Sequence, residues 1–350
     1  MSRRVRVVVA SDAVGELDSH AAGVAIAQGW ADLADVAVVP VADAGPPLGA
    51  ALARLLGGQL QVEEAGWSMV AEGTLAVGIS GSESGPGWDA AATSTGLGRW
   101  LASCLDSAAP LRRLVVDLTA TTALDGGAGL LAALGATASG GLTGGLAGLA
   151  QVGELCLGEV GERLRGVEVI GVVPGDETGL GLLGLQGAVA RRGYDARLDP
   201  AELLAAEAAM THWLGRLGVA DGPGCGAAGG AAAAVRALGG RVLRGAALCS
   251  ELAGLERTMA LADAVATGCT SFHIGNWGGE VVRYVADLAV AAERPCLLFA
   301  VESSVSRREM RTFGVEAAYA TGVGPLPEVL TAAASRVAGS WTALSEPRID

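Results

Sequence analysis

Aspartates follow three of the apolar runs that the sequence predicts as strands, and carboxylates at such positions can do chemistry. They are Asp12, after residues 5–10; Asp43, at the end of residues 35–43; and Asp125, after residues 112–120. In an open parallel sheet, ligands bind beyond the carboxyl ends of the strands. Carboxylates that converge there can hold Mg²⁺ or accept the proton of a hydroxyl group. The alternative for each aspartate is helix N-capping, which this residue type also does well.

Two glycine-rich loops suggest a site for phosphate. One follows Asp125 and the other spans residues 222–230, and the glycines that matter are Gly126, Gly127, Gly226, Gly229 and Gly230. A glycine loop that leads into a helix lets backbone N–H groups approach a phosphate. Neither loop has the GxxxxGK[ST] pattern, so tight turns or close helix packing remain the alternative for both.

The elements that must position these residues alternate between short β-rich runs and alanine–leucine helical stretches. This alternation predicts an α/β protein with mostly parallel strands. Residues 59–65 and 74–80 are expected as paired strands of a more mixed sheet. The other expected strands are 5–10, 35–43, 112–120, 166–176, 264–273 and 295–301, and the main expected helices are 20–34, 48–58, 96–106, 200–218, 251–263 and 281–293.

The composition narrows the possible partners. The chain has 350 residues, which suggests two domains, and a formal charge of −13. Nucleic acids and anionic membranes need a positive face, so neither is expected as a partner. The chain contains no lysine, and all 24 of its basic residues are arginine. Any permanently charged cationic side chain that contacts a phosphate must therefore be an arginine.

Cysteine usage and hydropathy predict a cytoplasmic protein. The six cysteines are scattered, without a CxxC pair, which is typical of buried free thiols in a reducing compartment. The N-terminal apolar run is too short for a secretory signal. The uncharged stretch at 126–153 is interrupted by glycines, so a membrane span is not expected there.

Several motifs in order resemble the type 1 glycerate kinase family over nearly the whole chain. They are SDAVGEL around Asp12, ADAGPPL around Asp43, TATTALDGGAGL around Asp125, GAAGGAAAAV at 226–235 and the Arg244–Gly245 pair. From Gly245 to Ala300 the family pattern aligns without gaps.

The resemblance implies a two-domain architecture, a mostly parallel doubly wound sheet with a second α/β domain inserted. Residues 1–60 and 245–350 would form the flavodoxin-like or Rossmann-like domain, and residues 61–244 the inserted one. The implied activity is ATP- and Mg²⁺-dependent phosphorylation of glycerate or a similar small hydroxy acid in a cleft between the domains. Asp12, Asp43 and Asp125 would be catalytic, with Asp43 and Asp125 as Mg²⁺ ligands and Arg244 as a phosphate contact. A homodimer or a protein partner is compatible with the sequence.

The departures from the family pattern fall on charged positions. Gly15 and Glu280 stand where the family has lysine, and Leu124 where it has asparagine. Such losses would slow phosphoryl transfer, which depends on positioning and charge neutralisation. Asp176 and Arg283 are candidate replacements near the substrate. The alternative is a catalytically inactive descendant that acts as a binding or regulatory protein.

The family's TGEGRID loop reads TGCTSFH here, with Cys269, Ser271 and His273 at its charged positions. These residues alternate along an expected strand and so share one face. On an extended strand, the cysteine and histidine would lie too far apart for a hydrogen bond. A relaxed former active-site loop is the simpler interpretation than a Cys–His nucleophile. Trp277, just beyond, either covers a ligand or packs against the protein.

Overall fold

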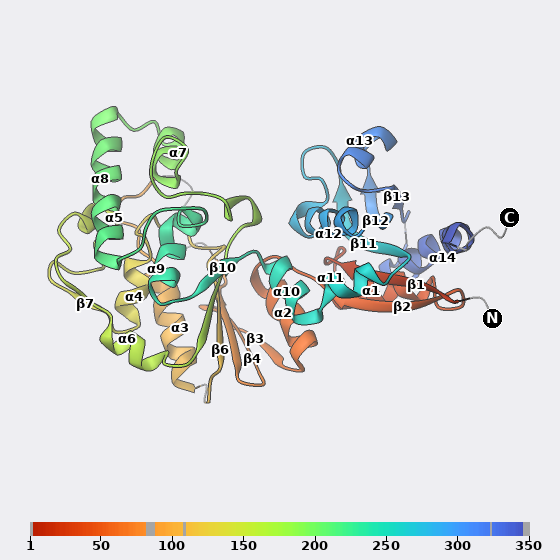
Figure 1. The fold of residues 1–350 in the computed structure, drawn as a ribbon, viewed down its shortest axis with the longest axis horizontal. Coiled ribbons are helices and arrows are strands. Elements are labelled where there is room, and N and C mark those ends of the chain that lie inside the picture. Colours follow the sequence, from red (N-terminus) through yellow and green to blue (C-terminus); the bar gives the residue numbers. More distant parts are fainter. Residues whose placement is uncertain (1–2, 82–87, 108–109, 323, 346–350) are drawn as a thin grey trace. The chain divides into compact units, whose positions relative to one another are not determined.

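The computed structural model describes residues 3–81, 88–107, 110–322 and 324–345. Its contacts divide the chain into two compact units. Unit 1 comprises Met1–Asp43, Ala50–Leu55 and Ala246–Asp350, and unit 2 comprises Ala44–Gly49 and Leu56–Gly245. The two ends of the chain, red and blue in Figure 1, thus belong to unit 1, and the yellow and green middle belongs to unit 2.

Unit 1 is built on a five-stranded sheet in the order β13-β12-β11-β1-β2, with every neighbouring pair parallel. The strands are β1 (Val5–Ser11), β2 (Ala34–Pro40), β11 (Ala264–Phe272), β12 (Cys296–Ser303) and β13 (Ala317–Ala320). Residues on both faces of β1 are buried, including Val8 and Val9. In a parallel sheet that is covered on both faces, the side chains on both sides of each strand are apolar. Such strands can therefore be recognised in the sequence as apolar runs.

Helices cover this sheet. They are α1 (Ser19–Gln28), α10 (Gly245–Ala253), α11 (Leu255–Ala260), α12 (Gly279–Ala291), α13 (Arg307–Thr312) and α14 (Leu326–Ser345). Helix α1 begins at the cap Asp18, whose side chain accepts the Ala21 N–H. It packs on α14, where a Cβ added to Gly29 would lie 2.5 Å from that of Ala334. Trp30 and Leu330 are buried in the same core.

Unit 2 contains a six-stranded mixed sheet in the order β10-β9-β6-β5-β4-β3. Its strands are β3 (Gln59–Val62), β4 (Gly66–Ala71), β5 (Thr74–Ile79), β6 (Arg113–Asp117), β9 (Glu168–Val172) and β10 (Arg241–Leu243). The pairs β3–β4 and β4–β5 are antiparallel, and the others are parallel. A separate two-stranded ribbon joins β7 (Thr137–Ala138) and β8 (Leu155–Cys156).

The expected pairing of residues 59–65 with 74–80 is wrong, because β4 lies between them. Strands β4 and β5 are joined by the two residues Glu72 and Gly73, both with positive φ (46° and 74°). The backbone twist of such a two-residue turn matches the twist of the strands on either side of it. Strands β4 and β5 therefore pair directly as a hairpin. The alternation in GWSMVA was the sequence signal for this strand.

The helices of unit 2 pack around its sheet. They are α3 (Thr95–Ser107), α4 (Ala128–Ala133), α5 (Gly145–Leu149), α6 (Gly158–Arg163), α7 (Ala188–Asp195), α8 (Pro200–Leu217) and α9 (Ala231–Ala237), with short 3₁₀ turns η1 (Gly175–Glu177) and η2 (Ala227–Gly230). Helix α2 (Gly45–Leu56) has residues in both units. The apolar side chains of these elements form one large core that includes Trp213.

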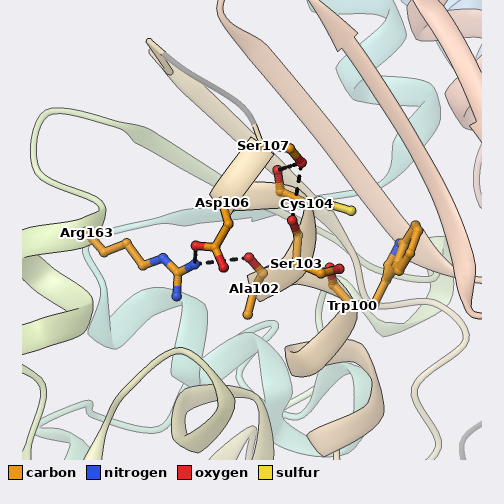
Figure 2. A network of polar contacts seen from close by, with 7 residues as sticks. All are labelled: Trp100, Ala102, Ser103, Cys104, Asp106, Ser107 and Arg163. Carbon is orange, nitrogen blue, oxygen red and sulfur yellow. Dashed lines mark hydrogen bonds and ion pairs between the residues drawn. The ribbon is translucent and has the colours of Figure 1, made fainter.

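Polar contacts fix α6 against α3 at the surface of unit 2. Figure 2 shows Arg163 bonded to the Asp106 carboxylate and to the Ala102 carbonyl. On α3 itself, the hydroxyls of Ser103 and Ser107 donate back to carbonyls of the preceding turn. A cavity of about 400 Å³ lies between this helix and strands β3 and β4.

Two expected helix boundaries are corrected by the structure. The helix expected at 20–34 ends at Gln28, because β2 already begins at Ala34. The helix expected at 251–263 is two helices, α10 and α11, which are interrupted at Gly254 with φ +61°. The strand expected within 166–176, with a loop at its end, is β9 (Glu168–Val172).

The fold class is confirmed as α/β with mostly parallel strands. The uncharged stretch at 126–153 contributes α4, β7 and α5. Within the described part of the chain, no helix combines the length and the apolar character that a membrane crossing requires.

Candidate functional site

The sheet of unit 1 changes winding direction between β1 and β11. The chain goes from β1 to β2 on one side, and from β11 through β12 to β13 on the other. Ligands of open α/β sheets bind at such a switch point, beyond the carboxyl ends of the strands. The loops that follow β1 and β11 are tied together there, because the Gly15 N–H donates to Thr270 Oγ1 at 2.8 Å.

Asp12 lies in the loop after β1, and the structure brings it close to Asp43. Asp12 is half-buried and its Oδ1 accepts the Ala13 N–H at 2.7 Å. Burial raises the pKa of Asp12 from the ordinary 3.8 to about 6; the Ala13 hydrogen bond opposes this change and the negative charge of Asp43 adds to it. A carboxyl group with such a pKa is mostly ionised at neutral pH and remains basic enough to take up a proton.

Asp43 follows β2 and faces the start of α10. Its Oδ1 accepts the Ala246 N–H over a long 3.4 Å, so the helix-capping alternative for this aspartate is present but weak. Together, Asp12 and Asp43 form a pair of half-buried carboxylates at the ends of adjacent parallel strands.

The Cys–His nucleophile is not supported. Burial, with the charge of Asp12, raises the pKa of the Cys269 thiol to about 12. The reactive form of cysteine is the thiolate, which is scarcely populated at neutral pH with such a pKa. The Cys269 thiol lies 3.5 Å from the Ser271 carbonyl oxygen, and His273 Nδ1 accepts the Gly275 N–H at 3.1 Å. Both groups are therefore engaged locally, with no sign of a nucleophile and its base.

Trp277 packs against the protein. Its ring stacks on Phe313 with centroids 4.9 Å apart, and Phe272 meets it edge-on at 6.1 Å. The guanidinium of Arg283 lies over the ring of Phe313, 5.1 Å from its centroid. Arg283 was expected near the substrate. Asn276 holds the preceding loop, since its Nδ2 donates to Ser271 Oγ at 2.8 Å.

Asp125, the third aspartate, belongs to unit 2 and is fully buried. Its carboxylate accepts four hydrogen bonds, from the Ser94 N–H and hydroxyl and from the N–H groups of Gly127 and Gly129, at 2.8 to 3.1 Å. Burial raises the pKa of Asp125 although these hydrogen bonds oppose it. In this conformation Asp125 holds its loop and has no exposed oxygen to offer to a metal ion.

The loop after Asp125 uses its own N–H groups. The Gly126 N–H donates to the Gly229 carbonyl at 3.1 Å, and the Gly127 N–H to Asp125. A Cβ at Gly127 would lie 2.5 Å from that of Ala234. Close packing, the alternative interpretation of these glycines, therefore accounts for both of them in this conformation.

The second glycine loop forms a left-handed turn. Ala228, Gly229 and Gly230 have φ values of 51°, 63° and 86°. The Gly226 N–H before them donates to the Leu180 carbonyl at 2.9 Å. The Ala228 N–H donates to Glu177 Oε2 at 2.8 Å. This turn thus already binds a carboxylate.

Sequence reasoning missed Arg192. Helix α7 places its guanidinium beside the residues that precede Asp125, where Nη1 donates to the Thr122 carbonyl at 2.7 Å. Burial lowers the pKa of Arg192 and the charge of Glu177 partly restores it. No local pattern distinguished it, because the residues it contacts are far away in the sequence.

Asp117 was also missed, since it reads as the end of a strand. It is buried, with 2% of its surface exposed, and accepts the Gly45 N–H at 2.7 Å and the Thr119 hydroxyl at 2.6 Å. Burial raises its pKa, against three opposing hydrogen bonds. Asp117 therefore fixes the turn at Gly45, which has φ +65°.

Two remaining candidates lie at the carboxyl ends of neighbouring parallel strands of unit 2. Arg244 follows β10 and is half-buried, and Asp176 is exposed on η1 after β9. The Thr121 hydroxyl, in the loop after β6, is buried and has no hydrogen-bond partner among the described residues. Such a hydroxyl is normally satisfied by water or a ligand.

Whether the protein can hold a metal ion depends on which side chains can act as its ligands. Among the described residues, no group of three or more His, Cys, Asp or Glu side chains is arranged to hold an ion. Mg²⁺ in kinases needs only one or two carboxylates, because water and substrate phosphates complete its shell. The Asp12–Asp43 pair fits that requirement, and Asp125 does not fit it in this conformation.

Comparisons with known proteins identify the family and the fold. Uncharacterized proteins of Mycobacterium tuberculosis and Mycobacterium bovis are each 28% identical over 342 residues, covering 90% of this chain and 83% of the relative. A crystal structure from Salmonella typhimurium LT2, provisionally named glycerate kinase 2, superposes with a TM-score of 0.77 at 23% identity; it covers 97% of this chain and 99% of that one. The model of the glycerate kinase family matches residues 7–344, and the chain therefore belongs to that family.

Proposed function

We propose that this chain transfers the γ-phosphoryl group of ATP to a hydroxyl of glycerate or a similar small hydroxy acid, with Asp12 accepting the hydroxyl proton. One observation carries this proposal. Asp12 and Asp43 lie together at the carboxyl ends of adjacent parallel strands, at the switch point of the unit 1 sheet. This is where an open α/β sheet binds its ligand, and a kinase needs a base and a metal ligand there.

In the proposed reaction the acceptor oxygen bonds to the γ-phosphorus and the bond from that phosphorus to the β–γ bridging oxygen breaks. ADP leaves, and the hydroxyl proton passes to Asp12. Asp43 would hold Mg²⁺, which when bound would supply charge that neutralises the transferred group. Because the chain has no lysine, any permanently charged cationic side chain that contacts the phosphates must be an arginine.

The test is phosphoryl transfer by the purified full chain, measured as ADP release with D-glycerate and a panel of other small hydroxy acids. We expect ATP-dependent turnover that Asp12→Asn lowers by at least about 100-fold, as for loss of a general base. Asp32→Asn is the matched control, because Asp32 is an exposed carboxylate of the same unit. Turnover that survives Asp12→Asn would remove the assigned base, and absence of turnover with every acid would remove the kinase proposal.

A specific observation favours a second candidate, a catalytically inactive member of the family that acts as a binding or regulatory protein. Gly126 and Gly127 donate their N–H groups within the protein, and Glu177 occupies the other glycine turn. Both features oppose a nucleotide phosphate. Isothermal titration with ATP·Mg²⁺ separates the candidates, since an inactive descendant of this kind gives no heat at near-millimolar nucleotide.

The same proposal includes a cytoplasmic location. All six cysteines are free, and five of them are buried. Unpaired thiols persist in reducing compartments, which supports the cytoplasm. The formal charge of −13 supports a small-molecule substrate over nucleic acid or an anionic membrane surface.

A further inference from the structure

The turn at residues 228–230 holds a carboxylate from a distant part of unit 2. Glu177 Oε2 accepts the Ala228 N–H at 2.8 Å, although the two residues are 51 positions apart. Three successive residues of this turn are left-handed. Backbone N–H groups in turns of this kind form concave donor sets that bind anions. Glu177 therefore occupies a position suited to an anionic ligand.

A cation lies at the same turn. Arg192 Nη1 donates to the Thr122 carbonyl, and a Cβ built on Gly229 would come within 3.0 Å of the same nitrogen. The charges of Arg192 and Glu177 interact. A guanidinium presents its N–H groups in a fork that suits carboxylate and phosphate alike. The turn and Arg192 thus combine the two kinds of donor that phosphate sites use.

The backbone of the turn is held in an unfavourable shape. Ala228 is left-handed, a conformation that residues with a Cβ rarely adopt. Gly229 cannot carry a side chain, because its Cβ would lie 2.0 Å from the Ala123 carbonyl oxygen. Strained residues concentrate at ligand sites, where the surroundings enforce them.

The position is open to solvent on one side. Glu177 and Arg192 are half-buried and Thr122 is exposed. The buried Thr121 hydroxyl of the same loop has no partner among the described residues. Neither Glu177 nor Arg192 is therefore sealed inside the core.

We infer that the 228–230 turn and Arg192 form a binding site for a phosphate-type anion, and that Glu177 fills this site as an internal anion. A phosphate-bearing ligand must displace Glu177 or bind beside its negative charge. Either event weakens binding, so Glu177 sets the affinity of the site. This inference rests on the geometry of unit 2 and does not depend on the activity proposed above.

The experiment is titration of the full chain with inorganic phosphate by calorimetry, at constant ionic strength and constant pH. Glu177→Ala removes the internal anion, and Glu154→Ala is the matched control, because Glu154 is an exposed carboxylate of the same unit. We expect Glu177→Ala to bind phosphate at least about tenfold more tightly than the unmodified chain, as for removal of a like charge. Glu154→Ala should behave like the unmodified chain. Adding Arg192→Met to Glu177→Ala should abolish the gain.

Glu177→Gln is a second variant, which keeps an oxygen for the Ala228 N–H and so protects the fold if Glu177→Ala does not form soluble protein. Equal phosphate affinity in the unmodified chain and in both Glu177 variants would overturn the inference. So would the absence of phosphate binding by both variants, which would leave Glu177 as a structural tie. Phosphate binding needs neither ATP nor a hydroxy acid, so this result and the result of the kinase assay are independent.

Discussion

Replacing Asp12 by asparagine should stabilise the protein at neutral pH while it removes the proposed base. The reason is the environment of this carboxyl group. Burial and the charge of Asp43 raise its folded-state pKa to about 6, against 3.8 for an ordinary aspartate. The folded protein therefore holds this proton more tightly than the unfolded chain does. Ionising Asp12 costs the folded state free energy, and asparagine carries no such cost.

The size of the effect follows from the two pKa values. A difference of about 2 corresponds to about 3 kcal/mol. Because the folded pKa is the raised one, this group's contribution favours folding at low pH and is lost as the pH rises through the interval from 3.8 to about 6. Above that interval, the ionised Asp12 lowers the free energy of unfolding of the unmodified chain by the full amount of about 3 kcal/mol. Below it, Asp12 is protonated in both states, and the unmodified chain and Asp12→Asn differ only by their local contacts.

The assay is urea unfolding of the unmodified chain and Asp12→Asn at several pH values between about 3.5 and 8. The free energy of unfolding of the variant, minus that of the unmodified chain, should rise with pH by about 3 kcal/mol, most steeply between pH 4 and pH 6. Asp32→Asn should give a flat difference, because Asp32 is exposed. A flat or falling difference for Asp12→Asn would refute the reasoning, since it would mean that a cation or additional hydrogen bonds stabilise the ionised carboxylate.

Two further predictions concern unit 2. Asp125→Ala should lower the free energy of unfolding by about 4 kcal/mol in urea titrations, because it leaves three buried N–H groups without their acceptor; a loss below about 1 kcal/mol would show that water replaces the carboxylate. Gly229→Ala should cost about 3 kcal/mol or more, since its Cβ would lie 2.0 Å from the Ala123 oxygen. Gly254→Ala is the control: it is also left-handed but has no atom within 4 Å of the added Cβ, so only about 1 kcal/mol is expected. Equal losses at the two glycines would contradict the close contact.

The elements were predictable where one local property was sufficient. Strands β1 and β12 are largely buried on both faces and appear in the sequence as apolar runs. Helix α8 begins with a capping box, in which the side chains of Asp199 and Glu202 each accept the backbone N–H of the other residue. It ends at the C-cap Gly218. Strand β4 was not predicted. It pairs with β5 through the short turn at Glu72 and Gly73. Pairing depends on the partner strand, which a local pattern does not contain.

The sequence by itself determined the α/β class, the family, and the positions of Asp12 and Asp43 at strand ends, because apolar runs and short motifs are properties of neighbouring residues. Only the tertiary structure decided how those residues are used. Asp125 is buried under four hydrogen bonds, including two from Ser94, 31 positions away. Arg192 reaches a carbonyl 70 positions away. The use of a carboxylate or guanidinium depends on which donors, charges and solvent surround it, and in this chain those surroundings come from segments far apart in the sequence.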